Sequence, residues 1–229
     1  MAHSPLSDDA PATMLFPQFE SALYNMITTE IAGLTEVQLD FESDRWKWSE
    51  WSIRRNVSHV ASGNFRWFWR SWGQQLFPEG LPNAQELDQL VTSPYERRLY
   101  EDLYLELDVV LDKLHQGLVL AQFILSQETV GSLRAKEVVF DHDIERWPWF
   151  LAAHPTGLRR EIEEASGEST TTRPTVYMSL EATFRHRYFE HITHLYNIQR
   201  LKRAQGLTTS IDIPFEGYWA LPSWDRSEP

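Results

Sequence analysis

The spacing of apolar residues along the chain predicts a helical protein. In the strongest segment, apolar side chains recur at every third or fourth position from Leu99 to Leu125, as on one face of an amphipathic helix. Gly33 and Gly206 each follow a similar apolar stripe and are typical helix terminators. Together these patterns predict four long helices, over residues 14–32, 49 or 52 to 72 or 73, 95–127 and 175–205.

The segments between these helices lack a sustained period. Residues 73–94 have the composition of a loop, whereas residues 131–174 are irregular, with a short extended piece predicted at 136–141 and a short helix at 158–164. We therefore predict an all-α fold: a four-helix bundle with a long irregular connection between helices three and four. The predicted organisation is a disordered N-terminus (1–13), the bundle (14–206), and an aromatic C-terminal tail packed on the bundle (207–229).

Composition and charge narrow the function. The chain has 229 residues and a net charge of −12, which argues against nucleic acid and anionic membranes as partners. It contains no cysteine, so any metal must be held by histidine, aspartate or glutamate. The polar start of the chain does not resemble a signal peptide, and no run of about 18 apolar residues indicates a membrane span. A cytoplasmic protein is the expectation.

Histidine is the residue type whose pattern suggests chemistry. His186, Glu190 and His194 fall within about 80° of the circumference of the fourth predicted helix, so Glu190 and His194 can reach one ion. His59, on the second predicted helix, is the best-placed third ligand. The alternative is a polar layer or a solvated face without metal. His191 lies nearer the middle of the apolar stripe, which makes it either a ligand or a core histidine.

Two stretches resemble a known family. Residues 50–60, Glu-Trp-Ser-Ile-Arg-Arg-Asn-Val-Ser-His-Val, are similar to the start of the second helix in the DinB/YfiT-like superfamily, in which a histidine at the position of His59 binds metal. His194, followed four residues later by Ile198, is similar to the end of the same family's second motif, and His186 matches a further histidine upstream. Glu190 occupies a position where many members have histidine, but a His, Glu, His set is similar to that of the mycothiol-dependent maleylpyruvate isomerase branch.

The resemblance implies a four-helix bundle that binds a divalent metal ion, Zn²⁺ or Ni²⁺, through His59, Glu190 and His194. It also implies an enzyme in which the ion activates a low-molecular-weight thiol or a water for transfer, isomerisation or hydrolysis. The expected partners are a small-molecule substrate or thiol cosubstrate and a second copy of the chain in a homodimer. The alternative is a non-catalytic, metal-stabilised or ligand-binding stress protein of the same fold; a third hypothesis is a structural dimer without metal.

Several other residues have two interpretations each. His154, in a loop, is a weak candidate for covering the site, and His142, between two aspartates, fits a solvated turn better than a metal site. Arginines 54, 55, 185 and 187 either bind an anionic substrate or pair with nearby acids. Tryptophans 46, 48 and 51 either close the end of the bundle or line a pocket, and tryptophans 67, 69 and 72 spread around their helix, which suggests a dimer surface or a contact with the tail.

Overall fold

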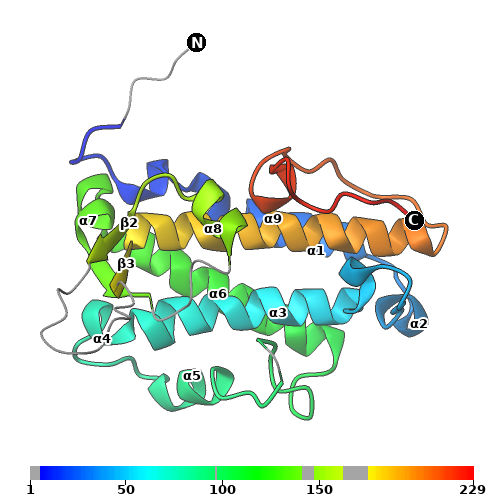
Figure 1. Cartoon of the computed structure of the whole chain (residues 1–229). Helices are drawn as coiled ribbons and strands as arrows, with labels where there is room; N and C mark the ends of the chain where they lie inside the picture. Colours follow the sequence, from blue (N-terminus) through cyan, green and yellow to red (C-terminus); the bar gives the residue numbers. More distant parts are fainter. Residues whose placement is uncertain (1–5, 96, 141–146, 162–174) are drawn as a thin grey trace, which may run out of the picture.

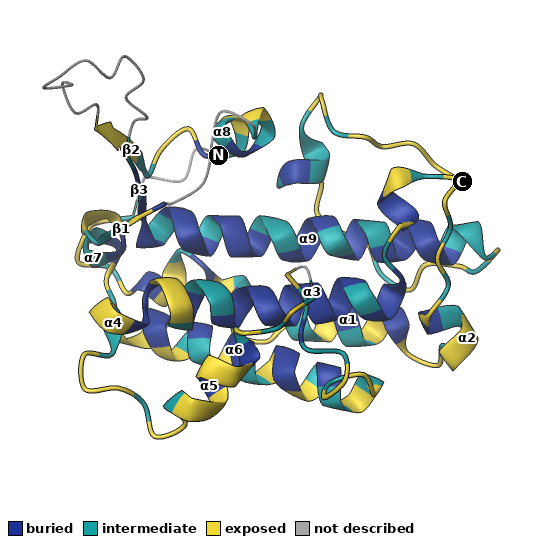
Figure 2. Cartoon of the chain, turned by 60° about the horizontal axis from the view of Figure 1, so that its bottom comes forward, coloured by how far each residue is buried: buried dark blue, intermediate teal, exposed yellow. Residues whose placement is uncertain are grey.

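In the computed structural model, four long helices lie side by side (Figure 1). The structure describes residues 6–95, 97–140, 147–161 and 175–229. The long helices are α1 (Ala22–Ile31), α3 (Ile53–Phe65), α6 (Leu107–Gln127) and α9 (Leu180–Ala204). Their apolar faces form one continuous core, and α9 is buried along most of its length (Figure 2).

Shorter elements connect and cap these helices. The short α-helices are α2 (Glu36–Leu39), α4 (Gly73–Leu76), α5 (Ala84–Leu90), α7 (Val130–Ala135) and α8 (Pro148–Ala153). A π-helical segment, Arg66–Ser71, continues directly from the end of α3. Single 3₁₀ turns are formed by Ala12–Met14, Pro17–Phe19, Lys47–Ser49 and Tyr218–Ala220.

A small β-sheet shows that the all-α prediction was wrong. Strands β1 (Glu137–Val139), β2 (Leu158–Glu161) and β3 (Thr175–Ser179) form an antiparallel sheet in the order β1-β3-β2, so the fold is mixed rather than a pure four-helix bundle. The start predicted for the fourth helix is strand β3. Here Val176 and Met178 are buried while Tyr177 is half-buried, an alternation that belongs to a strand.

The same error affects the helix predicted at 158–164, since residues 158–161 form β2 and 162–164 lie outside the described residues. The extended piece predicted at 136–141 contains β1. Thr175, Val176 and Tyr177 are strong strand formers, but the long apolar stripe that follows them has helical spacing and obscured the boundary. Ser179 then begins α9, because its side chain accepts a hydrogen bond from the backbone N–H of Ala182.

Helix α6 begins 12 residues later than the pattern predicted, at Leu107 instead of residue 95. It is also long and apolar enough to cross a membrane by length and composition, contrary to the expectation that no segment would be. Half of that window is buried, because α6 packs against α1 and α3. The apolar character of α6 is therefore accounted for by the core of the folded chain.

Both ends of the chain contact the helices. Within the predicted disordered N-terminus, Ala12 is buried and its N–H donates to the carbonyl of Glu128. After α9, the C-terminal segment runs back along the helix, and Tyr218 is fully buried against it (Figure 1). Near the end of α9, Lys202 forms a buried ion pair with Glu30 of α1, at 2.6 Å.

Candidate metal centre

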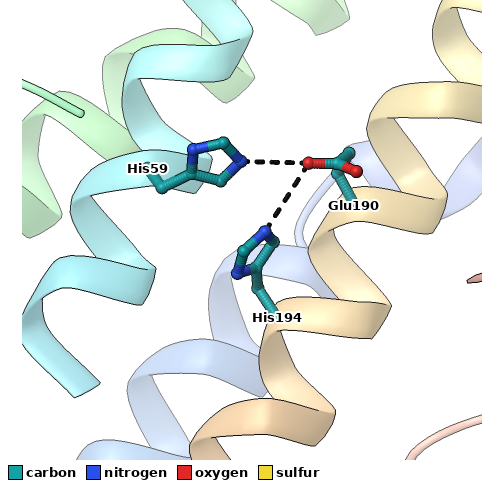
Figure 3. Close-up of side chains that lie close together, drawn as sticks. All are labelled: His59, Glu190 and His194. Carbon is teal, nitrogen blue, oxygen red and sulfur yellow. Dashed lines mark hydrogen bonds and ion pairs between the residues drawn. The ribbon is translucent and has the colours of Figure 1, made fainter. Parts of the chain in front are cut away.

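The structure brings together the three residues predicted to bind metal. His59 comes from α3, whereas Glu190 and His194 come from successive turns of α9, and both imidazoles point at one carboxylate oxygen (Figure 3). Glu190 Oε2 lies 3.0 Å from His59 Nε2 and 3.6 Å from His194 Nε2. One ligand atom from each residue lies within 4.8 Å of the others. The group can hold a metal ion, since two ligands of a tetrahedral Zn²⁺ are separated by about 3.3 Å.

Local sequence sets where each candidate ligand lies along its helix. The Ser52 side chain caps α3 by accepting a hydrogen bond from the N–H of Arg55, so the helix begins at Ile53, less than two turns before His59. On α9, a spacing of four residues places Glu190 and His194 one above the other. Helices α3 and α9 pack against each other, and His59 faces Glu190, with His194 one turn further along α9 (Figure 3).

The orientation of the His59 ring is fixed from behind. Its Nδ1 lies 2.9 Å from the backbone carbonyl of Arg97, an atom that can only accept a hydrogen bond. Arg97 adopts a left-handed backbone conformation (φ 53°), which is uncommon for a residue with a side chain and is energetically unfavourable. Both ring nitrogens of His59 therefore face oxygen atoms, Nδ1 the carbonyl of Arg97 and Nε2 the carboxylate of Glu190.

His194 is held in the same way by Asn56. The side-chain N–H₂ of Asn56 donates to the carbonyls of Trp51 and Ser52, at 3.0 and 2.8 Å, which leaves its oxygen facing His194. That oxygen lies 2.7 Å from His194 Nδ1. Hydrogen bonding from Nδ1 to an oxygen is the arrangement that orients histidine ligands of metal ions.

The ring of His59 has too few N–H groups for its contacts with oxygen atoms. A neutral imidazole has a single N–H, yet both nitrogens of His59 face oxygen acceptors. Burial lowers the pKa of His59 to about 3, so the ring is neutral at pH 7. Burial raises the pKa of Glu190, but the adjacent His194 and His59 outweigh it, and the pKa is well below its ordinary value. A neutral His59 can therefore donate to only one of its two oxygen neighbours, and a cation between Nε2 and Glu190 would leave the N–H on Nδ1 to donate to Arg97.

The site is accessible from one side. The side chain of His59 is 3% exposed, whereas those of Glu190 and His194 are each 14% exposed. Trp51 forms the wall next to both histidines, with its ring centre 5.0 Å from that of His59 and 6.1 Å from that of His194. Trp51 therefore lies against both candidate histidine ligands.

The other histidines of α9 lie outside this group. His191 is buried in the core beside Phe19, and its Nδ1 lies 2.7 Å from the backbone carbonyl of Arg187. His186 points away towards Tyr218, whose hydroxyl lies 2.6 Å from its Nδ1. Neither residue replaces Glu190 as a candidate ligand.

A buried His-Tyr-His cluster adjoins the site and was missed by sequence reasoning. The Tyr218 hydroxyl lies between His186 and His154, 2.9 Å from His154 Nε2. The cluster is enclosed by aromatic rings, including those of Phe150 and Trp149. The aromatic composition of the tail indicated packing on the body, but nothing in the sequence linked Tyr218 to either histidine. His154 thus packs inside the fold beside α9.

Three of the four arginines considered as anion ligands are paired with acids. Arg54 binds Glu36 and Asp40, Arg55 binds Glu42 and Glu101, and Arg185 binds Glu181. A cavity of about 210 Å³ beside α3 is lined by Arg54 and Arg55 with Asp40, Glu42 and Glu101, and does not include the three candidate ligands. The fourth, Arg187, is fully buried and donates to Val60 O and Asn64 Oδ1.

The remaining candidates have varied positions. Trp46 and Trp48 stack on each other near the start of α3, and Trp48 is buried. Trp72 is fully buried and donates to Thr183, whereas Trp69 donates to Asp88 of α5. Trp67 stacks on Phe140. The aspartates and the histidine at positions 141–143 lie outside the described residues.

Comparison of the chain with protein-family models, curated proteins and solved structures gave no match. The resemblance to the DinB/YfiT-like superfamily therefore depends on the short motifs around His59 and His194 alone. The geometry of the site is an independent observation, since it follows from the positions of α3 and α9.

Proposed function

We propose that the chain is a metal-dependent enzyme that holds a divalent ion, Zn²⁺ or Ni²⁺, through His59, Glu190 and His194. The observation that carries the proposal is that ligand atoms of His59, Glu190 and His194 lie within 4.8 Å of one another, while a neutral His59 has one N–H for two oxygen neighbours. Two imidazole nitrogens and one carboxylate oxygen form a donor set suited to these ions.

The chemistry follows from the number of ligands. Three protein ligands leave one position open for a small molecule, and the partial exposure of Glu190 and His194 gives access to it. A divalent ion supplies Lewis acidity there, which lowers the pKa of a water or thiol. Since the chain has no cysteine, a thiol would come from a cosubstrate. The Arg97 carbonyl and Asn56 orient the two histidine ligands, while Trp51 excludes water from one side.

Elemental analysis of protein purified without chelator tests the metal. We expect about one zinc or nickel per chain, removed by chelator and regained on adding one equivalent. Replacing His115, an exposed histidine that packs on Tyr24, with alanine should leave this stoichiometry unchanged. Protein that binds no ion even after reconstitution would contradict the proposal.

Turnover distinguishes the enzyme from the metal-stabilised alternative. Metal-loaded protein should accelerate consumption of a low-molecular-weight thiol in the presence of an electrophile, measured by titration of free thiol, or the hydrolysis of an activated ester. A chain that binds the ion and does neither would be the non-catalytic protein.

Asn56 offers a test of how the ligands are oriented. Replacing Asn56 with leucine removes the acceptor for His194 Nδ1, and we expect metal affinity to fall about 10–100-fold while the ion is still bound. Competition with a chromogenic chelator measures the change. Asn25→Leu, on the exposed face of α1, is the matched control and should retain wild-type affinity. Equal affinities of the two variants would show that Asn56 does not orient the ligand.

A further inference from the structure

Arg66 follows the last residue of α3 and continues the face of that helix that carries His59. The two residues are seven positions apart, which is two helical turns. Arg66 is the first residue of the π-helical segment, a form of helix found frequently at functional sites. Because α9 runs in the opposite direction, Arg66 lies towards the Arg187 end of the α3–α9 interface, and Asn56 and His194 lie towards the other end.

The guanidinium of Arg66 makes no hydrogen bond or ion pair with any residue in the part of the chain that the structure describes. Its Nε–H is buried without an acceptor. Arg98 and Arg200 each have an Nε–H in the same condition, but Arg98 pairs with Glu101 and Arg200 donates through another nitrogen to the carbonyl of Asp225. A partly buried cation without a partner is unfavourable, so the site favours a negatively charged group.

The surroundings of Arg66 are also positive. Burial, followed by the charges of Arg187 and Arg97, lowers the pKa of Arg66 to about 9, while Glu190 raises it. At pH 7 the side chain is still charged. If Glu190 is a ligand of a divalent ion, its charge is compensated there, and Arg66 and the buried Arg187, which contacts no acid among the described residues, remain as positive charges in a chain whose net charge is −12. This local excess of positive charge is what an anionic ligand would neutralise.

We propose that Arg66 binds the acidic group, a carboxylate or phosphate, of the small molecule whose reactive atom faces the ion at His59, Glu190 and His194. The substrate class is thus a small acid, which Arg66 positions through the fork of its guanidinium. The inference rests on the proposed function for the reactive end of the molecule. The anion-binding step itself requires no metal.

Anion titration of the whole chain tests this subsite. Chelator-treated and zinc-loaded protein are titrated with sodium sulfate and with sodium acetate at constant ionic strength, with tryptophan fluorescence as the readout. We expect saturable binding of at least one of these anions in both forms. Arg66→Met should weaken it at least tenfold, and Arg66→Lys should weaken it less. Arg70→Met, an exposed arginine of the same π-helical segment, is the matched control and should bind like wild type.

The outcomes separate this inference from the metal proposal. If the protein binds no zinc but binds an anion through Arg66, the anion subsite is supported and the metal proposal is contradicted. Zinc binding with no saturable anion binding, or with anion binding unchanged in Arg66→Met, would overturn the subsite alone.

A second measurement addresses a purely structural role for Arg66. Since removing an unpartnered buried cation relieves an unfavourable burial, the midpoint of thermal unfolding of Arg66→Met without added anion should not fall below that of wild type. A clear fall would mean that the side chain stabilises the fold, and would overturn the proposal.

Discussion

Replacing Glu190 with glutamine is expected to abolish stoichiometric metal binding without destabilising the metal-free protein. The amide loses the negative charge that balances the ion. However, its N–H₂ can donate to His59 Nε2, which in the wild type faces a carboxylate oxygen at 3.0 Å. The variant should thus lose metal binding and keep the stability of the metal-free protein. A variant that merely unfolds would lose both metal binding and stability.

Thermal unfolding with and without metal measures this effect. An ion present at 100–1,000 times its dissociation constant stabilises the folded wild type by about 2.7–4.1 kcal/mol. For a chain of this size that corresponds to a rise of roughly 5–15 °C in the unfolding midpoint. Glu190→Gln should show no such rise, and its metal-free midpoint should equal or exceed that of the metal-free wild type.

A metal-free midpoint several degrees below wild type would contradict this interpretation. It would indicate that His59 is protonated and forms an ion pair with Glu190, in which case no cation is needed between them. His191→Gln is a useful comparison, because His191 is on the same helix but buried beside Phe19, away from the site. It should keep the metal-induced rise.

The sequence predicted the ligands of this site better than it predicted the fold around them. A spacing of four residues on a helix is enough to place Glu190 and His194 together. The capped start of the helix before His59 indicates on which side of that helix His59 lies. What holds the histidines was not predictable. The carbonyl of Arg97 reaches His59 because residues before α6 leave the helical pattern, with Arg97 in a left-handed conformation that no apolar spacing reveals.

The β-sheet was not predicted because its strands are short and pair across distant parts of the chain. The alternation of Val176, Tyr177 and Met178 is only three residues long and continues without a break into the 25-residue helix α9. A short strand next to a long amphipathic helix is absorbed into the helix when periodicity is the signal. Its partner strands β1 and β2 are equally short, and pairing between distant segments is a property of the folded chain that single-sequence patterns do not carry.

Tyr218 illustrates a third limit. Its hydroxyl joins His154 and His186, which are 64 and 32 residues away in the chain. The aromatic tail favoured packing, yet the choice of histidine partners depends on how the tail turns at Gly217, where φ is +78° and a side chain would approach Phe189 closely. Such partners emerge from tertiary packing rather than local pattern.

Replacing Glu30 with glutamine is expected to lower the free energy of unfolding by about 3–5 kcal/mol, since it breaks a buried ion pair and leaves the charge of Lys202 uncompensated. The Glu30 carboxylate also accepts hydrogen bonds from Gln199 and from the backbone N–H groups of Ser210 and Ile211. An amide cannot satisfy all these donors, so the segment after α9 should loosen as well.

Urea unfolding measures the loss, and amide hydrogen exchange at Ser210 and Ile211 reports the loosening. Glu20→Gln, at an exposed position, is the control and should change stability by less than about 0.5 kcal/mol. The double variant Glu30→Gln with Lys202→Met also removes the uncompensated charge, and should recover part of the stability lost in Glu30→Gln, because the amide oxygen still accepts from the remaining donors. If the single variant were as stable as wild type, the pair would not hold α1, α9 and the tail together.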